Sequence, residues 1–340
     1  MKVLKYILFL LLILTIGISI YVVVQPNSFE VTRERTINAP ASVIYNHLID
    51  FKNWEPWSPW LEKKPDTKLM YSEKTTGVGG SYSWEDDEGI GKMKTLSTTP
   101  NISIEQDIQF DDYEPSKVNW TFAPTSEGGT KVTWQMKGDS LPFMFKAYAA
   151  FSGGFDKMIG PDFERGLEKL DSVVIDDMKK YSITIQGATQ HSGGFYLYNT
   201  TSCKINELEP KMKEMLPKVL NYASSNSITV AGPPFVNYLK WDPENNAVIF
   251  LCCVPTTSKV ITTNGDILTG QLEPFRAVKA ILKGNYSNLQ EAWEKTMAYL
   301  PEHGLEANEN GPNLEAYVTD PLNYPNPADW ITEIFVAIKE

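Results

Sequence analysis

The chain has 340 residues, and at roughly 100–200 residues per domain this length predicts two domains. A composition that is 42% hydrophobic and 21% charged is typical of a folded protein and excludes a disordered one. The net charge is −11 and no stretch is rich in Lys and Arg, which argues against a surface that follows nucleic-acid phosphates. We therefore expect no nucleic-acid partner.

Cysteine and histidine are few. Cys252 and Cys253 are adjacent in an apolar run, which is typical of buried thiols on a strand, and with Cys203 their number is odd, so a complete disulfide framework is excluded. None of the three histidines has metal-ligand spacing to another His or Cys: His47, His191 and His303. We expect neither a metal site nor a cofactor.

Residues 6–24 form an uncharged apolar segment at the N-terminus. At about 1.5 Å per residue, a helix of this length approaches the roughly 30 Å hydrocarbon core of a bilayer. A signal peptide, the alternative, has a shorter apolar region and a small-residue cleavage site, which Tyr21-Val-Val-Val-Gln-Pro26 lacks. We expect residues 1–27 to be a cytoplasmic stub and an uncleaved transmembrane anchor.

The charges beside this segment predict its orientation. Lys2 and Lys5 precede it, and the positive-inside rule keeps them in the cytoplasm. Arg33 and Arg35 on the other flank weaken the asymmetry. The expectation is a single-pass membrane protein whose soluble domains are extracytoplasmic, on the periplasmic side if the protein is bacterial.

The first soluble body is expected over residues 28–178. Residues 29–37 alternate like a strand, residues 41–48 have helical spacing, and residues 142–178 read as a long helical stretch, loosened at Ser152-Gly-Gly154 and Gly160-Pro161. Short strands separated by turn signals are predicted between them, at 67–72, 80–84, 91–97, 102–110, 116–122 and 130–137. This order predicts an antiparallel sheet around a helix, with an apolar concave face that can hold a cavity.

The motifs Thr36-Ile-Asn-Ala-Pro-Ala-Ser-Val-Ile-Tyr45, Trp57-Ser-Pro-Trp60 and Gly80-Ser-Tyr-Ser-Trp84 resemble the START-like superfamily (SRPBCC, polyketide cyclase/dehydrase type). The resemblance covers the whole body and implies a helix-grip fold with a hydrophobic tunnel, in which many members bind lipids or other apolar molecules. Four tryptophans either line that tunnel or pack the helices onto the sheet: Trp54, Trp57, Trp60 and Trp84.

The second body is expected over residues 182–340. Its predicted strands are 181–185, 194–198, 230–241, 247–254, 269–271, 275–282, 313–319 and 331–338, and its predicted helices are 205–222 and 289–300. The order β–α–β–β occurs twice, at 194–254 and 274–338. Two such units joined side by side leave a cleft at their junction, which is a natural ligand site.

Three segments of this body resemble the GyrI-like small-molecule-binding domain, which is also the effector-binding domain of some AraC-type and MerR-type regulators: Ala231-Gly-Pro-Pro-Phe-Val-Asn-Tyr238, residues 283–293 and residues 314–321. The His of that family's His-x-Gly-x-Tyr turn is replaced here, in Ile281-Leu-Lys-Gly-Asn-Tyr286. The resemblance implies that the acidic residue in the strand before the last, Glu315, meets cationic aromatic ligands.

The chemistry of Glu315 is consistent with that role. A carboxylate in an aromatic cleft attracts a cation, and each aromatic face adds a cation–π contact of about 0.5–2 kcal/mol. Glu315 and Tyr317 have the same strand parity and should face one side. The expected pocket walls are Phe235, Tyr238, Tyr286, Trp293 and Tyr317, although the helical spacing of Trp293 with Leu289 and Leu300 also favours core packing.

The sequence thus predicts an α+β protein: a transmembrane helix, a helix-grip domain and a duplicated β–α–β–β GyrI-like domain. The expected function is membrane-anchored binding, sensing or sequestration of a hydrophobic or cationic amphipathic small molecule. One alternative is a small-molecule hydrolase in which Glu315 is the general base for water, although no G-x-S-x-G or P-loop pattern is found. Another is a scaffold whose cavities are closed by side chains.

Overall fold

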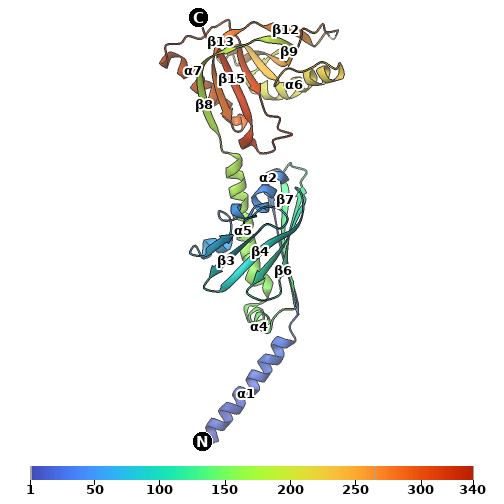
Figure 1. Cartoon of the computed structure of the whole chain (residues 1–340), viewed down its shortest axis with the longest axis vertical. Helices are drawn as coiled ribbons and strands as arrows, with labels where there is room; N and C mark the ends of the chain where they lie inside the picture. The colour runs from blue at the N-terminus through green and yellow to red at the C-terminus, as the bar shows by residue number, and fades with distance from the viewer. Residues whose placement is uncertain (1, 264, 340) are drawn as a thin grey trace. The chain divides into compact units, whose positions relative to one another are not determined.

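A computed structural model of the protein describes residues 2–263 and 265–339. The chain divides into two compact units between Asp177 and Met178. Both are mixed α+β units with one antiparallel sheet each, and an apolar helix precedes the first (Figure 1). The fold class expected from the sequence is found at this level.

The N-terminal helix α1 (Lys2–Val23) is almost entirely exposed and apolar. Its segment Val3–Val23, with a mean hydropathy of 2.7, is long and apolar enough to cross a membrane, a property that an N-terminal signal sequence shares. It is the one helix with that property among residues 2–263 and 265–339.

The first unit contains a seven-stranded sheet with the order β1-β7-β6-β5-β4-β3-β2. Its strands are β1 (Ser28–Ile37), β2 (Lys68–Tyr71), β3 (Ser81–Asp86), β4 (Gly89–Thr99), β5 (Ser103–Phe110), β6 (Ser116–Pro124) and β7 (Thr130–Asp139). Its helices are α2 (Ala41–Ile49), η1 (Phe51–Asn53), α3 (Pro59–Lys63), α4 (Phe143–Ser152) and α5 (Phe155–Met178). Each strand predicted here is present, with ends that differ by a few residues.

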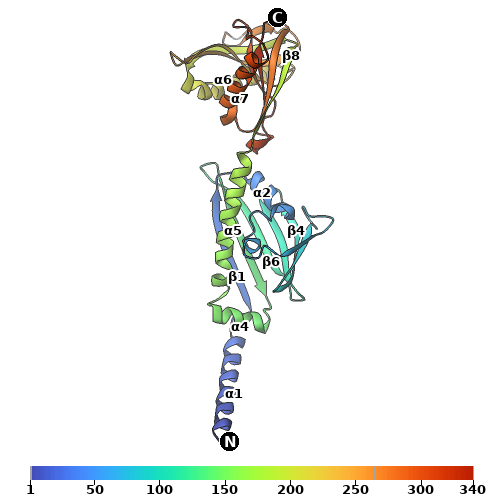
Figure 2. The ribbon, with the colours of Figure 1, turned by 90° about the vertical axis from the view of Figure 1, so that its left-hand side faces the viewer.

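Helix α5 lies across one face of this sheet (Figure 2). It buries Phe163, Leu167, Leu170 and Val174, which recur every three to four residues along one side of the helix. Beneath it the ring of Trp134 stacks on Phe163, with centroids 4.0 Å apart. This contact and the apolar stripe fix the helix on the sheet.

The long helical stretch breaks at one of its two predicted positions. Gly153 and Gly154 have φ values of 89° and 100°, which favour glycine, and they separate α4 from α5. The expected break at Gly160-Pro161 is not found, because α5 continues through Pro161. Arg33 on β1 pairs with Asp156 at 2.8 Å and with Glu164 at 2.7 Å, which holds the helix on both sides of the proline.

The second unit contains an eight-stranded sheet with the order β12-β9-β11-β10-β14-β15-β13-β8. Its strands are β8 (Ser182–His191), β9 (Gly194–Lys204), β10 (Phe235–Asp242), β11 (Ala247–Thr256), β12 (Leu268–Leu272), β13 (Phe275–Lys283), β14 (Asn313–Tyr317) and β15 (Ile331–Ala337). Its helices are η2 (Ile205–Glu207), α6 (Leu208–Ser225), η3 (Tyr286–Asn288), α7 (Leu289–Glu302) and η4 (Pro327–Asp329). The segments β9-α6-β10-β11 and β13-α7-β14-β15 have the same order, and β10 pairs with β14 where they meet.

Both helices of this unit pack on the same face of the sheet. Val236 lies in the cluster under α6, and Ile334 lies in the cluster under α7. Each of them pairs directly with Glu315, and paired residues of antiparallel strands point to the same side. The other face carries a separate core of eight residues: Tyr196, Phe235, Leu251, Cys253, Leu272, Ala277, Leu314 and Phe335.

Candidate functional site

Glu315 lies near the middle of the second sheet, on β14, and only 3% of it is exposed. Its neighbours across the strands are Val236 on β10 and Ile334 on β15, so its side chain stands between the core under α6 and the core under α7. A carboxylate in such a place loses its hydration, which costs several kcal/mol unless other groups replace the water.

Aromatic side chains supply that replacement. The indole Nε1 of Trp293 on α7 donates a hydrogen bond to Oε1 of Glu315. The hydroxyl of Tyr317 donates to Oε2 over 2.7 Å, and the Tyr238 hydroxyl is a third group that stabilises the carboxylate. Glu315 has no ion pair with any side chain in the described parts of the chain. The carboxylate is therefore bonded but not neutralised.

Burial and hydrogen bonding act on the pKa of Glu315 in opposite directions. Burial raises the pKa above its usual value, and the hydrogen bonds from Trp293, Tyr317 and Tyr238 limit that rise. The pKa values of Tyr238 and Tyr317 are raised well above the ordinary value, mainly by burial and secondly by the nearby charge of Glu315. The two phenols therefore stay protonated and act as hydrogen-bond donors to the carboxylate.

The donors continue into a wider group of rings. Tyr238 meets Trp293 edge to face at 5.8 Å, and Tyr286 meets Tyr317 in the same way at 5.4 Å. These four rings are only partly buried, unlike the carboxylate. The structure thus brings together Glu315 and four of the five wall residues expected from the sequence.

Phe235, the fifth expected wall residue, lies on the opposite face of the sheet. It pairs with Ala316 and not with Glu315, and its ring packs on Tyr196 at 5.5 Å. Side chains alternate along a strand, so a residue three positions before Tyr238 points away from it. Phe235 therefore belongs to the second core and does not share a wall with Glu315.

Two further rings extend the group. Trp330 lies 4.6 Å from Tyr286, and Trp241 lies 6.0 Å from Tyr238. Strand alternation alone would place Trp241 on the face opposite Tyr238, but a register shift between Tyr238 and Lys240 turns it to the same side. The bulge gives no signal in the sequence, and Trp330 lies between the short helix η4 and β15, outside any strand or helix pattern, so the sequence did not predict either ring.

Among the residues that the structure describes, no group of three or more His, Cys, Asp and Glu side chains could hold a metal ion. Cys252 and Cys253 are fully buried free thiols, and burial raises the pKa of Cys252 to about 12. Neither of these thiols is available as a thiolate for metal binding or nucleophilic attack near neutral pH.

In the first unit, tryptophans fill the face of the sheet that α5 covers. Trp54 and Trp57 are buried and pack against Trp120, with ring centroids about 6 Å apart in each case. Trp60 is 37% exposed, and Trp84 lies farther along the sheet on β3. Trp54 and Trp57 therefore pack the N-terminal helices onto the sheet, the second of the two roles considered for them.

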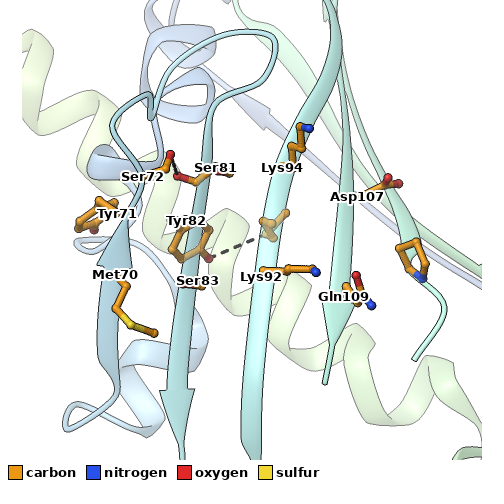
Figure 3. A pocket seen from close by; sticks show the side chains of 12 residues that line it. Met70, Tyr71, Ser72, Ser81, Tyr82, Ser83, Lys92, Lys94, Asp107 and Gln109 are labelled. Carbon is orange, nitrogen blue, oxygen red and sulfur yellow. Dashed lines mark hydrogen bonds between the residues drawn. The ribbon is translucent and has the colours of Figure 1, made fainter. Parts of the chain in front are cut away.

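A groove of about 480 Å³ lies on β2–β5 of the first unit (Figure 3). Met93 and Ile108 pair with each other and are buried on the face that carries the tryptophans. Side chains alternate along a strand, so the groove's polar residues Lys92, Lys94 and Gln109 point to the opposite face. A second groove, of about 670 Å³, lies between α6, β9 and the chain before β12 in the second unit. Neither groove is lined by Glu315.

Each of the two compact units matches a protein family. Residues 28–174 match the family described as polyketide cyclase / dehydrase and lipid transport. Residues 195–339 match the GyrI-like small molecule binding domain. The chain thus consists of a polyketide cyclase/dehydrase-type domain followed by a GyrI-like domain, as expected from the sequence, and these domains suggest small-molecule binding.

Solved structures show weaker likeness. EcmrR in a DNA complex is 15% identical over 58% of this chain and 72% of that chain, with a TM-score of 0.41. The EcmrR C-terminal domain is 16% identical over 47% of this chain and 98% of that domain, with a TM-score of 0.39. Protein MLL2253 from Mesorhizobium loti is 22% identical over 44% and 97%, with a TM-score of 0.32. No curated protein matches the chain. At these TM-scores the structures add nothing to the family matches.

Proposed function

We propose that the protein binds cationic aromatic or amphipathic small molecules at Glu315 and holds them close to a membrane, as a sensor or a sequestering protein. The single observation that carries this proposal is a carboxylate, 3% exposed, that meets aromatic donors and no cation among the described residues. A positively charged ligand would supply the missing countercharge.

The free energy of such a site favours cations over neutral molecules. Desolvation of Glu315 costs free energy in the empty protein, and a cationic ligand recovers part of it by direct attraction. The ring faces of Tyr238, Tyr286 and Trp293 can add cation–π contacts of about 0.5–2 kcal/mol each. An uncharged ring of the same size would gain only the apolar contacts.

The same rings govern access to the carboxylate. Trp293 lies on α7 and covers Oε1, while Tyr317 on β14 covers Oε2. A ligand reaches Glu315 by taking the place of one of these donors. We propose that the β9-α6-β10-β11 and β13-α7-β14-β15 segments are a duplicated unit, and that ligand enters between α6 and α7 above the β10–β14 junction.

The hydrolase alternative requires Glu315 to accept a proton from water. In the structure each Glu315 oxygen already accepts a hydrogen bond from an aromatic donor. Burial keeps the pKa of Glu315 raised in spite of these donors, so basicity alone does not exclude proton abstraction. Water would have to displace Trp293 or Tyr317 without bringing a charge, whereas a cationic ligand gains direct attraction to the carboxylate by the same displacement, so the arrangement suits charge recognition better. We therefore propose binding without turnover.

The test is a calorimetric comparison of N-methylacridinium, a permanent cation, with N-methylacridone, a neutral ring system without an N–H donor. Glu315→Gln should weaken binding of the cation by about 1–3 kcal/mol, roughly 5- to 150-fold, and leave binding of N-methylacridone nearly unchanged. Glu333→Gln is the matched control, because Glu333 pairs with Lys279 and lies on the other face of the sheet. Equal affinities of wild type and Glu315→Gln for both compounds would contradict the proposal.

We also propose that α1 is an uncleaved anchor, and that the soluble units are extracytoplasmic. The apolar segment Val3–Val23 and the lysines before it support this. Native protein should stay in the membrane fraction after a carbonate wash and keep residues 6–24. A mature N-terminus that begins after Gln25 would show a cleaved signal sequence instead.

A further inference from the structure

Helix α4 exposes an apolar stripe. Phe143, Met144, Tyr148 and Phe151, called here the α4 stripe, are 46%, 69%, 66% and 66% exposed. At about 100° per residue these four side chains fall within about 140° of one another on the helix. The stripe carries no charged side chain. A surface helix of a soluble protein normally turns such a stripe inward.

The opposite side of α4 contacts the rest of the first unit. Ala149 is buried, and the ring of Phe145 meets Tyr113 edge to face at 5.0 Å. The helix therefore already has a packed side, and the α4 stripe is a second apolar side that is largely exposed, with Phe151 meeting the ring of Tyr21 on α1. The neighbouring α5 shows the ordinary arrangement, with Leu167 and Leu170 buried and Glu168 exposed.

Short connections place α4 close to the end of α1. Helix α1 ends at Val23, and the carbonyl of Asn27 accepts a hydrogen bond of 3.2 Å from the amide of Leu141, two residues before α4. Four residues span at most about 15 Å. Lys146 on α4 donates to the carbonyl of Gln25 over 3.3 Å, and Phe151 lies 6.3 Å from the ring of Tyr21.

We propose that α4 is an interfacial helix that lays the α4 stripe into the headgroup region of the bilayer spanned by α1. The inference rests on the proposed anchor. The chain between Val23 and Asn27 is too short for α4 to leave the membrane surface, whatever the direction of α1. Aromatic side chains are enriched at the boundary between lipid and water, where an exposed Phe or Tyr is favourable.

The position of the stripe favours lipid over a protein partner. The short connection from Val23 to Asn27 keeps α4 beside the end of α1, so a lipid surface is present wherever α1 is inserted. A phosphatidylcholine surface has no net charge and accepts rings and a thioether at the boundary between headgroups and acyl chains. Since the α4 stripe is uncharged, the contact should not depend on ionic strength or on anionic lipid.

The experiment uses the full chain reconstituted into phosphatidylcholine vesicles. A Cys203→Ser background removes the one partly accessible thiol, since Cys252 and Cys253 are buried. The fluorophore NBD is attached at Met144→Cys on the stripe, where Met144 is 69% exposed, or at Ile102→Cys in the turn before β5, where Ile102 is 59% exposed. At position 144 we expect blue-shifted emission, quenching by doxyl-labelled lipid and several-fold weaker quenching by iodide than at position 102.

A second variant tests whether the stripe itself is responsible. Phe151→Glu places a charge in the α4 stripe and should remove the lipid quenching at position 144, while circular dichroism stays unchanged. Flotation of the protein with the vesicles tests the membrane anchor α1 separately. Protein that does not float refutes the anchor and with it the basis of the inference. Protein that floats while position 144 is as open to iodide as position 102 overturns the role of α4 alone.

Discussion

The hydroxyl of Tyr317 donates a hydrogen bond of 2.7 Å to the carboxylate of Glu315, two residues earlier on the same strand. The other carboxylate oxygen accepts from Trp293, which belongs to α7. One buried acid thus connects a strand in the middle of the sheet to a helix that lies on it. A ligand that takes Glu315 away from Trp293 would act directly on the packing of α7.

The first prediction concerns pH. Because burial raises the pKa of Glu315 in the folded protein, its contribution to stability is fully present below its unfolded pKa of about 4.3. That contribution is lost as the pH rises through the folded pKa. Glu315→Gln cannot ionise, so its melting temperature relative to wild type should rise from pH 5 to pH 8 without ligand. If the difference between the two melting temperatures stays constant over this pH range, burial of the Glu315 carboxylate does not destabilise the folded protein.

The second prediction concerns the hydrogen bond from Tyr317. Tyr317→Phe removes a donor to a charged group, which should lower the free energy of unfolding at pH 7.5 by about 1.5–3 kcal/mol. The pKa of Glu315 should then rise further, because one of the bonds that oppose the rise is gone.

Tyr286→Phe is the matched control for Tyr317→Phe. Its ring contacts Tyr317 and Trp330, but its hydroxyl has no hydrogen-bond partner in the described chain. Urea unfolding should place this variant within about 0.5 kcal/mol of wild type. Equal losses for Tyr286→Phe and Tyr317→Phe would mean that the loss comes from the ring environment and not from the bond to Glu315.

The third prediction concerns Gly166 on α5. Helix propensity alone favours Gly166→Ala by about 1 kcal/mol. A Cβ atom there would lie 2.8 Å from the ring of Trp134, which is itself held against Phe163. We therefore expect a net destabilisation of about 1–3 kcal/mol, the usual cost of overpacking. Ser172→Ala, at an exposed position of the same helix, should be neutral or slightly stabilising, and an unfolding titration of both variants would compare them.

The fourth prediction concerns the domain boundary. We propose that residues 28–178 and 182–340 fold independently, since the compact units divide between Asp177 and Met178. A fragment of residues 183–340 should give the circular dichroism of a folded α+β protein and melt cooperatively. An unfolded spectrum would show that this domain depends on the first unit.

Most of the fold could be predicted because its signals are local. Alternation gave the strands on either side of Glu315, and helical spacing gave α6 and α7. The continuity of α5 through Pro161 was not predicted, because a proline in a helical pattern normally ends or kinks the helix. Arg33 contacts the helix on both sides of this proline, through two residues more than 120 positions away in the sequence. Ion pairs of this kind leave no periodic pattern.

The candidate site was partly predictable for the same reason. The shared parity of Glu315 and Tyr317 is a property of one strand and was correctly read. The prediction that Phe235 shares a wall with Tyr238 was wrong, because residues three positions apart on a strand point to opposite faces. Trp241 was not predicted, because a bulge after Tyr238 reverses that alternation. The hydrogen bond from Trp293 joins a helix to a strand and depends on tertiary packing alone.

The stacked indoles of the first unit also have an optical consequence. Trp120 and Trp134 lie with ring centroids 4.4 Å apart and planes 22° from parallel, close enough for their electronic transitions to couple as an exciton. In the described part of the second unit, Trp241, Trp293 and Trp330 contact tyrosines and no other indole. An exciton couplet in the ultraviolet circular dichroism spectrum would therefore arise from the first unit alone. Its loss on heating would follow the melting of that unit inside the intact chain, without any label.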